Sequence, residues 1–273
     1  MTRLVPVTLL RATAAVLAVY GYVVALWLTT HDLNPQPVAT IREWVNRPLG
    51  VGEDFGPFAV MLLLVCTGYT AAATGFTVRR LVLVCLPALV AAILAAAVAI
   101  TGLEAWTVPG GIALVPLAWV TGLQAISWLV ALDERTWPTT LLLFTAVAAL
   151  CLLADVEPML GRPLLFLPLV LIGHVTWRVL DRTLPAGAGV LLGVCCVAAI
   201  LGVERAFPEL ARWWYPVAAS IAVPLFLAAV RTAGPTATRL AAHPVTRFLA
   251  GSAEWALLVG GVVTFAVLGL VTS

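Results

Sequence analysis

Three histidines are the side chains best suited to acid–base chemistry in this chain of 273 residues. An imidazole has an unperturbed pKa of about 6.5, so it can take a proton from a hydroxyl and return it near neutral pH. His174 lies inside an apolar stretch, where an ionisable group is costly and usually faces a partner or a wet cavity. We therefore consider His174 a candidate catalytic base. A neutral imidazole that bonds a backbone carbonyl between helices is the alternative.

The other two histidines lie at the ends of apolar stretches. His31 is followed by Asp32, and together they could form an acid–base pair for a hydroxyl substrate. A polar helix end in water is the alternative for this pair. His243 stands between Arg239 and Arg247, and we interpret it as part of a solvated basic segment.

Charged and sulfur-containing side chains add one further candidate site. The adjacent Arg79 and Arg80 could bind phosphate groups, or they could anchor the chain at the membrane surface. The five cysteines show neither a disulfide framework nor metal-ligand spacing, so the sequence predicts no metal site. All five fall within apolar stretches: Cys66, Cys85, Cys151, Cys195 and Cys196.

Nine long apolar stretches must position these side chains. Hydrophobic residues make up 62% of the chain and charged residues only 10%. A bilayer core of roughly 30 Å needs about 20 helical residues, and the stretches meet or nearly meet that length. The sequence therefore predicts an all-α bundle of nine or ten transmembrane helices that forms a single domain over 1–273. The nine stretches are 12–30, 55–78, 81–103, 105–132, 136–154, 163–180, 183–203, 213–230 and 248–271.

The distribution of arginine predicts the orientation of the bundle. With the N-terminus in the cytoplasm, ten arginines lie on or near the inner side and five on the outer side. This bias follows the positive-inside rule for nine helices. The absence of lysine and the abundance of Ala, Val and Leu are typical of a GC-rich bacterial genome, so we expect a bacterial plasma membrane. The net charge of +2 gives no indication of a nucleic-acid partner.

Two outer segments have the pattern of helices that lie in the membrane interface. Within 38–48, the apolar residues Val38, Ile41 and Trp44 recur at helical spacing. Within 204–213, Phe207 and Leu210 precede a cluster of aromatic residues. We expect an interfacial helix at each segment; aromatic side chains at headgroup depth are the alternative explanation.

Four segments resemble, in order, the acyltransferase-3 family of integral membrane acyltransferases. They are Leu10–Tyr20, Phe58–Thr70 followed by Phe76, Arg79, Arg80 and Pro87, Ser127–Trp137, and Leu249–Trp255. The resemblance covers about the first 140 residues and, beyond them, one short segment. Members of this family move acyl groups from a coenzyme A donor to carbohydrate or lipid hydroxyls.

The resemblance implies a set of site residues. Arg11 corresponds to the family's first-helix arginine, which pairs with a carboxylate or a donor phosphate. Tyr22 stands near the position of the family's histidine base, and a phenol with a reference pKa of about 10 is a poor base. Asp133 and Glu134 correspond to the family's carboxylate. Thr67, Arg79 and Arg80 are expected to contact the acyl-coenzyme A donor, which is a substrate and not a bound cofactor.

The expected activity is transfer of an acetyl or short acyl group from acyl-coenzyme A to an extracytoplasmic glycan or glycolipid hydroxyl. Two alternatives remain open at this point. The chain could be an inactive family member that acts as scaffold or subunit beside an envelope-protein partner. It could also be a carrier of lipid-linked intermediates, which would keep a cavity but no acid–base pair, and which broken helices would support.

Overall fold

The computed structural model describes six ranges of the chain, and its regular elements there are all helices, without strands. This confirms the predicted all-α class for the described part of the chain. The described ranges are 4–29, 31–49, 53–75, 166–206, 215–232 and 234–272, with scattered positions between 77 and 93.

The first helix is long enough to cross a bilayer. It consists of α1 (Val5–Gly21), which continues into the π-helical η2 (Tyr22–Leu28). Pro6 stands in its first turn, where a missing backbone N–H costs no hydrogen bond. The segment Val5–Ala25 has 21 apolar-rich residues. At 1.5 Å per residue it spans about 32 Å.

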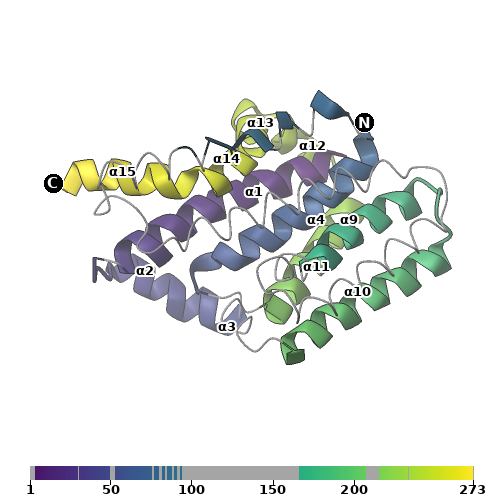
Figure 1. Cartoon of the computed structure of the whole chain (residues 1–273), viewed down its shortest axis with the longest axis horizontal. Helices are drawn as coiled ribbons and strands as arrows, with labels where there is room; N and C mark the ends of the chain where they lie inside the picture. The colour runs from purple at the N-terminus through teal and green to yellow at the C-terminus, as the bar shows by residue number, and fades with distance from the viewer. Residues whose placement is uncertain are drawn as a thin grey trace.

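The helix α4 (Gly56–Thr74) lies at the centre of the molecule, between α1 and α9 (Leu167–Leu180). Figure 1 shows these three helices side by side, with α10 (Ala186–Ala206) beyond α9. The helix α11 (Tyr215–Arg231) packs against α4 as well. Most side chains of α4 are buried, so this helix forms the core around which the others are arranged.

A left-handed turn leads into α4. It belongs to the short 3-10 helix η4 (Glu53–Phe55), in which Asp54 and Phe55 have φ values of 57° and 60°. There α1 and α4 approach closely, since a Cβ on Gly21 would stand 3.2 Å from the Cα of Gly56. The approach holds the C-terminal end of α1 against the start of α4.

The segment between the first helix and α4 is itself helical, and we call its helices the outer helices after the side on which the sequence predicts them. It contains α2 (Gln36–Ile41), the π-helical η3 (Arg42–Asn46) and the single turn α3 (Arg47–Leu49). These helices cover the predicted segment 38–48, and their position in a membrane interface stays a prediction. Most of the second predicted interfacial segment, 204–213, lies outside the described residues, although α10 reaches Ala206.

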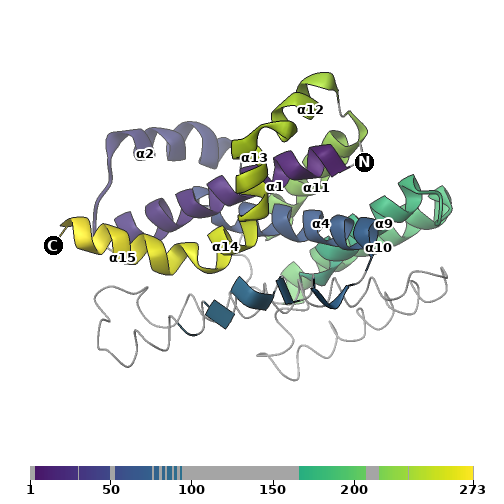
Figure 2. The same ribbon diagram turned by 90° about the horizontal axis from the view of Figure 1, so that it is seen from above.

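The C-terminal region differs from the single helix predicted over 248–271. After α12 (Pro235–Ala242) come α13 (Pro244–Gly251), α14 (Ala253–Leu258) and α15 (Gly260–Thr272). The helix is interrupted at Ser252 and Val259, each flanked by glycine, which is a weak helix former. Figure 2 shows α13 crossing α1, with α14 and α15 continuing toward the far end of the first helix.

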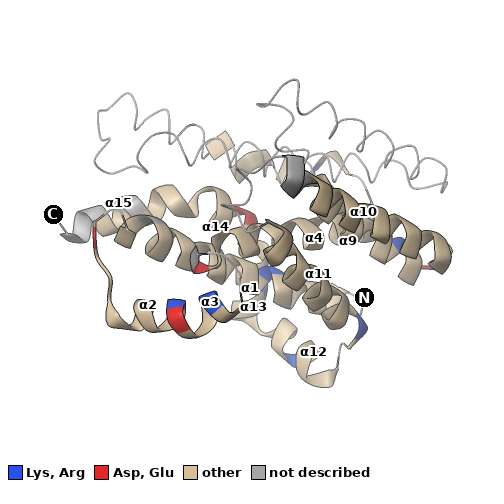
Figure 3. Cartoon of the chain, turned by 90° about the horizontal axis from the view of Figure 1, so that it is seen from below, with Lys and Arg blue, Asp and Glu red and all other residues tan. Residues whose placement is uncertain are grey.

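By composition and length, two of the described helices could span a membrane, or three if a bent pair forms one span. Val5–Ala25 and Gly56–Thr74 are long and apolar enough to cross a bilayer. Pro216–Arg231 and Pro235–Ala242 meet the same criterion together, although they are bent by 104°, whereas Leu167–Leu180 and Ala186–Gly202 are apolar but shorter. Figure 3 shows few charged positions on these ribbons. The predicted spans over 105–132 and 136–154 lie outside the described residues.

Candidate functional site

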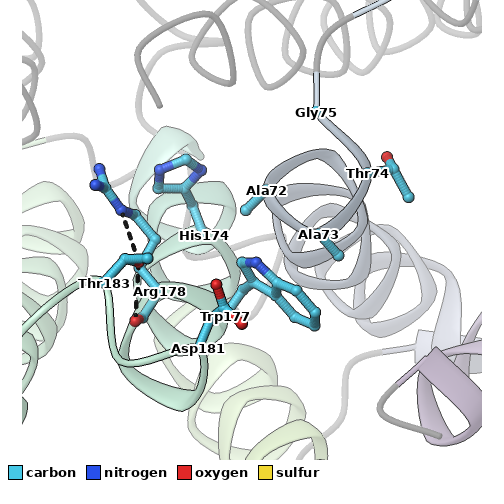
Figure 4. A pocket seen from close by; sticks show the side chains of 9 residues that line it. All are labelled: Ala72, Ala73, Thr74, Gly75, His174, Trp177, Arg178, Asp181 and Thr183. Atoms are coloured by element: carbon cyan, nitrogen blue, oxygen red, sulfur yellow. Dashed lines mark hydrogen bonds between the residues drawn. The ribbon is translucent and has the colours of Figure 1, made fainter. Parts of the chain in front are cut away.

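A pocket of about 370 Å³ lies between the C-terminal ends of α4 and α9. Figure 4 shows its lining, with small residues on one side and polar and aromatic residues on the other. The α4 side contributes Ala72, Ala73, Thr74 and Gly75, and the α9 side contributes His174, Trp177, Arg178, Asp181 and Thr183. This volume falls within the range of small-molecule sites.

Close packing of α4 and α9 fixes the walls of this pocket. Gly68 and Gly173 allow the backbones of the two helices to touch. Beyond this contact, the ring of Tyr69 meets Trp177 edge to face, with ring centroids 5.2 Å apart. Trp177 therefore stands as a fixed wall between the two helices.

Two ionisable side chains of the pocket are almost completely buried. His174 and Arg178 are each 5% exposed, and they lie one helical turn apart on the same face of α9. Figure 4 shows their side chains next to each other above Trp177. Burial at this level is unusual for arginine and indicates that its charge is compensated by the surrounding structure.

The turn after α9 closes this end of the pocket. The amide of Thr183 donates to the carbonyl oxygen of Arg178 at 3.0 Å, and the Thr183 hydroxyl donates to the same oxygen at 3.1 Å. The Nε of Arg178 lies 3.4 Å from the Thr183 hydroxyl oxygen. Asp181, in the same turn, adds a carboxylate to the lining. The pocket thus combines an imidazole, a guanidinium and a carboxylate.

Arg11 lies away from this pocket, on the side of α1 that faces the C-terminal helices. Its guanidinium donates to both carboxylate oxygens of Glu254, at 2.5 and 2.6 Å, and to the carbonyl oxygen of Ala250 at 3.2 Å. The two charged side chains are 17% and 9% exposed. Sequence reasoning did not single out Glu254, although it is the one acid after residue 209 and belongs to the fourth family-like segment.

Tyr22 also faces the C-terminal helices. Its hydroxyl donates a hydrogen bond to the carbonyl oxygen of Leu257. Its ring lies on Gly260 and Gly261, where a Cβ on Gly261 would stand 3.0 Å from the ring. Tyr22 therefore holds the break between α14 and α15 against the first helix, and its hydroxyl does not lie with His174.

The expected donor-binding residues have different surroundings. The Thr67 hydroxyl is buried in α4 and donates to the carbonyl oxygen of Leu63 at 2.8 Å. Arg79 is exposed, four residues beyond Gly75 of the pocket. Arg80, Asp133 and Glu134 lie outside the described residues.

The remaining two histidines are exposed. His31 stacks on Trp27 with ring centroids 3.9 Å apart, and its Nδ1 lies 2.9 Å from the Trp27 carbonyl oxygen. His243 directly precedes α13, and its side chain makes no hydrogen bond to the first turn of that helix. In the described part of the chain, no three His, Cys, Asp or Glu side chains gather as a metal site.

Comparison with protein-family models, with curated proteins and with solved structures finds no match for this chain.

Proposed function

We propose that this chain is an integral membrane acyltransferase of the acyltransferase-3 type in a bacterial plasma membrane. In this proposal it has nine transmembrane helices and a cytoplasmic N-terminus. It transfers an acetyl or short acyl group from cytoplasmic acyl-coenzyme A to an extracytoplasmic glycan or glycolipid hydroxyl. The observation that carries the proposal is the pocket between α4 and α9, with the buried His174 and Arg178 in its wall.

His174 is the base in this mechanism. It stands near the middle of α9, about 10 Å from Leu167 and about 9 Å from Leu180 along the helix axis. Its imidazole takes the proton of the acceptor hydroxyl as the oxygen attacks the thioester carbonyl carbon. The carbon–sulfur bond then breaks, and the imidazolium returns the proton to the sulfur of coenzyme A. The products are the ester and free coenzyme A.

Arg178 and Arg79 supply positive charge for the donor. The guanidinium of Arg178, in the pocket wall, suits the developing negative charge on the thioester oxygen. Arg79 is four residues from Gly75, so their Cα atoms are at most about 14 Å apart. With the N-terminus in the cytoplasm both arginines lie at the inner ends of their helices, where the phosphates of coenzyme A would arrive.

The first-helix residues have a positioning role in this proposal. Glu254 compensates the charge of Arg11, and the Tyr22 hydroxyl donates its hydrogen bond to the Leu257 carbonyl oxygen. Both contacts join α1 to the C-terminal helices. The base that the family has in its first helix is therefore supplied by α9.

The test is release of coenzyme A from radiolabelled acetyl-coenzyme A by the purified protein in nanodiscs, with envelope lipid extract as acceptor. We expect acceptor-dependent release that falls about 100-fold or more in His174→Gln, as typical for loss of a positioned base. His243→Gln is the matched control and should retain the wild-type rate, because His243 is exposed and does not line the pocket. Folded protein without release, or equal rates in the two variants, would refute the proposal.

The broken C-terminal helix supports a second candidate, a carrier of lipid-linked intermediates. Transporters often place charged groups beside interrupted helices. Here Glu254 lies two residues after the interruption at Ser252 and pairs with Arg11 inside the helix bundle. A carrier would move a fluorescent lipid-linked sugar across proteoliposome membranes without coenzyme A release, and Glu254→Gln would alter that movement. An acyltransferase would show the opposite pattern of results.

A further inference from the structure

A second polar site lies where the end of α1 meets η3 and η4. Its members are Tyr20, Arg42, Asn46 and Asp54, which we name the outer polar cluster. Asp54 is 0% exposed, and its carboxylate accepts hydrogen bonds from Arg42 at 2.7, 3.0 and 3.2 Å. The side chain of Arg42 is 30% exposed, so the cluster is near the molecular surface on that side.

Two buried polar atoms of this cluster have no hydrogen-bond partner among the described residues. They are the Oδ1 of Asn46, a residue only 5% exposed, and the hydroxyl oxygen of Tyr20. The Nδ2 of Asn46 is directed at the Asp54 carboxylate, at 3.5 Å. A carboxylate can only accept, so this contact fixes the amide orientation and leaves Oδ1 as the atom that needs a donor.

The ring of Tyr20 is held in place beside the carboxylate. It contacts Phe55 edge to face, with centroids 5.9 Å apart, and Phe55 directly follows Asp54. Asp54 and Phe55 both have left-handed backbone conformations, which are costly for residues with side chains. This strained turn therefore sets the positions of both the Asp54 carboxylate and the Phe55 ring that contacts Tyr20.

The charges of the outer polar cluster select a neutral ligand. Arg42 and Asp54 compensate each other, so neither a free anion nor a free cation gains a counter-charge there. The Asn46 Oδ1 needs a donor, and the Tyr20 hydroxyl can donate or accept. A hydroxyl group suits either atom, because it can donate to the Asn46 Oδ1 and can accept from the Tyr20 hydroxyl.

We propose that the outer polar cluster binds a hydroxyl group of a neutral polyol, carried by a carbohydrate or by a glycerol headgroup. This inference goes beyond acyl transfer and does not depend on it. Asp54 precedes the start of α4, whereas Thr74 of the pocket is the last residue of that helix. The 18 helical steps between Gly56 and Thr74 separate the two sites by about 27 Å.

The experiment measures thermal unfolding of the protein in nanodiscs. One arm titrates methyl glucoside into phosphatidylcholine nanodiscs, and the other compares phosphatidylglycerol with phosphatidylserine nanodiscs, which match its net charge but lack the glycerol headgroup. A ligand that binds only the folded state raises Tm in a concentration-dependent manner. We expect such a rise in the carbohydrate arm, the glycerol arm or both, and the arm that responds identifies the source of the hydroxyl.

Tyr20→Phe removes one hydroxyl and preserves the ring. Its Tm without ligand should equal or exceed that of the wild type, because the variant no longer buries an unpartnered group. The apparent Kd for the responding ligand should weaken about tenfold, which corresponds to one hydrogen bond. Tyr22→Phe is the matched control on the same helix and should keep the wild-type ligand response, since its hydroxyl bonds Leu257.

Two results would overturn the proposal. The first is a wild-type Tm that responds in neither arm while Tyr20→Phe is destabilised, which would mean that the cluster holds only water. The second is an equal ligand response in Tyr20→Phe and Tyr22→Phe, which would place the ligand elsewhere on the protein.

Discussion

Gly68 of α4 and Gly173 of α9 lie in reciprocal contact with the backbone of the opposite helix. A Cβ on Gly68 would meet the carbonyl group of Val170, and a Cβ on Gly173 would meet the carbonyl oxygen of Val65 and the amide nitrogen of Tyr69. Small residues permit such close helix approach in membrane proteins. The two glycines therefore determine how near the walls of the candidate pocket can come.

Gly173→Ala should destabilise the fold by more than the addition of one methyl group usually does. A Cβ there would stand 2.8 Å from the Tyr69 amide nitrogen, a backbone atom that cannot turn aside. We expect a loss of about 3 kcal/mol, at the upper end of overpacking costs. Apparent Tm in detergent, followed by tryptophan fluorescence, would measure the loss.

Gly193→Ala provides the control for the Gly173 prediction. Gly193 lies in α10, and no atom lies within 4 Å of its hypothetical Cβ. Alanine has the higher helix propensity, so this substitution should leave Tm unchanged or raise it. Similar losses in the two variants would contradict the close contact between α4 and α9.

Removing either partner of the Arg11–Glu254 pair should cost more than removing both. Arg11→Met or Glu254→Leu alone leaves one buried charge without its counter-charge, and we expect a loss of about 3 kcal/mol in each case. The double variant removes both charges and should be more stable than either single variant. A double-mutant cycle on unfolding in mild detergent measures the coupling, and additive losses would argue against the ion pair.

Tyr22→Phe and Tyr22→Ala should separate the hydroxyl of Tyr22 from its ring. The first removes the bond to the Leu257 carbonyl and should cost about 1 kcal/mol. The second also removes the ring that covers Gly260 and Gly261, and should cost about 3–5 kcal/mol. Hydrogen exchange at residues 257–261 would report both losses locally. Equal protection in both variants would be inconsistent with the packing of the ring on α15.

The Arg42–Asp54 pair should contribute strongly to the attachment of the outer helices. Arg42→Ala leaves a buried carboxylate with fewer donors, and we expect a loss of about 1.5–3 kcal/mol, the value of hydrogen bonds to charged groups. Arg42→Lys should recover only part of this, because lysine cannot reproduce the two-nitrogen contact. The measurement is Tm together with protease cleavage in 36–49.

Arg47→Ala is the matched control for the outer helices, since Arg47 is exposed and lies on the neighbouring turn. This variant should keep the wild-type Tm and the wild-type cleavage rate. An equal effect of Arg42→Ala and Arg47→Ala would show that the general charge of this segment matters and not the specific contact.

Hydropathy predicted the positions of three described helices closely. The predicted spans 55–78, 163–180 and 183–203 contain α4, α9 and most of α10, because each is a charge-poor run of the required length. The break at Ser252 was not predicted, because average hydropathy takes no account of a single turn within an apolar run. The helix count of nine stays a prediction.

The sequence could single out individual candidate side chains but not the partners that contact them. His174 was chosen because an ionisable group inside an apolar stretch needs a reason, and it lines the pocket. Glu254 was not chosen, since its link to Arg11 spans the whole fold and leaves no local pattern. The surroundings of Arg178 were missed for the same reason, because they depend on how α9 packs against α4.

The Arg11–Glu254 contact also constrains how the protein is made. The two residues are 243 positions apart, so at about 5–20 residues per second the ribosome needs about 12–50 s to deliver the partner. During that interval Arg11 lacks its counter-charge, and an unpaired guanidinium is expensive in hydrocarbon. A chain truncated before Glu254 would therefore leave the guanidinium of Arg11 without its counter-charge for good.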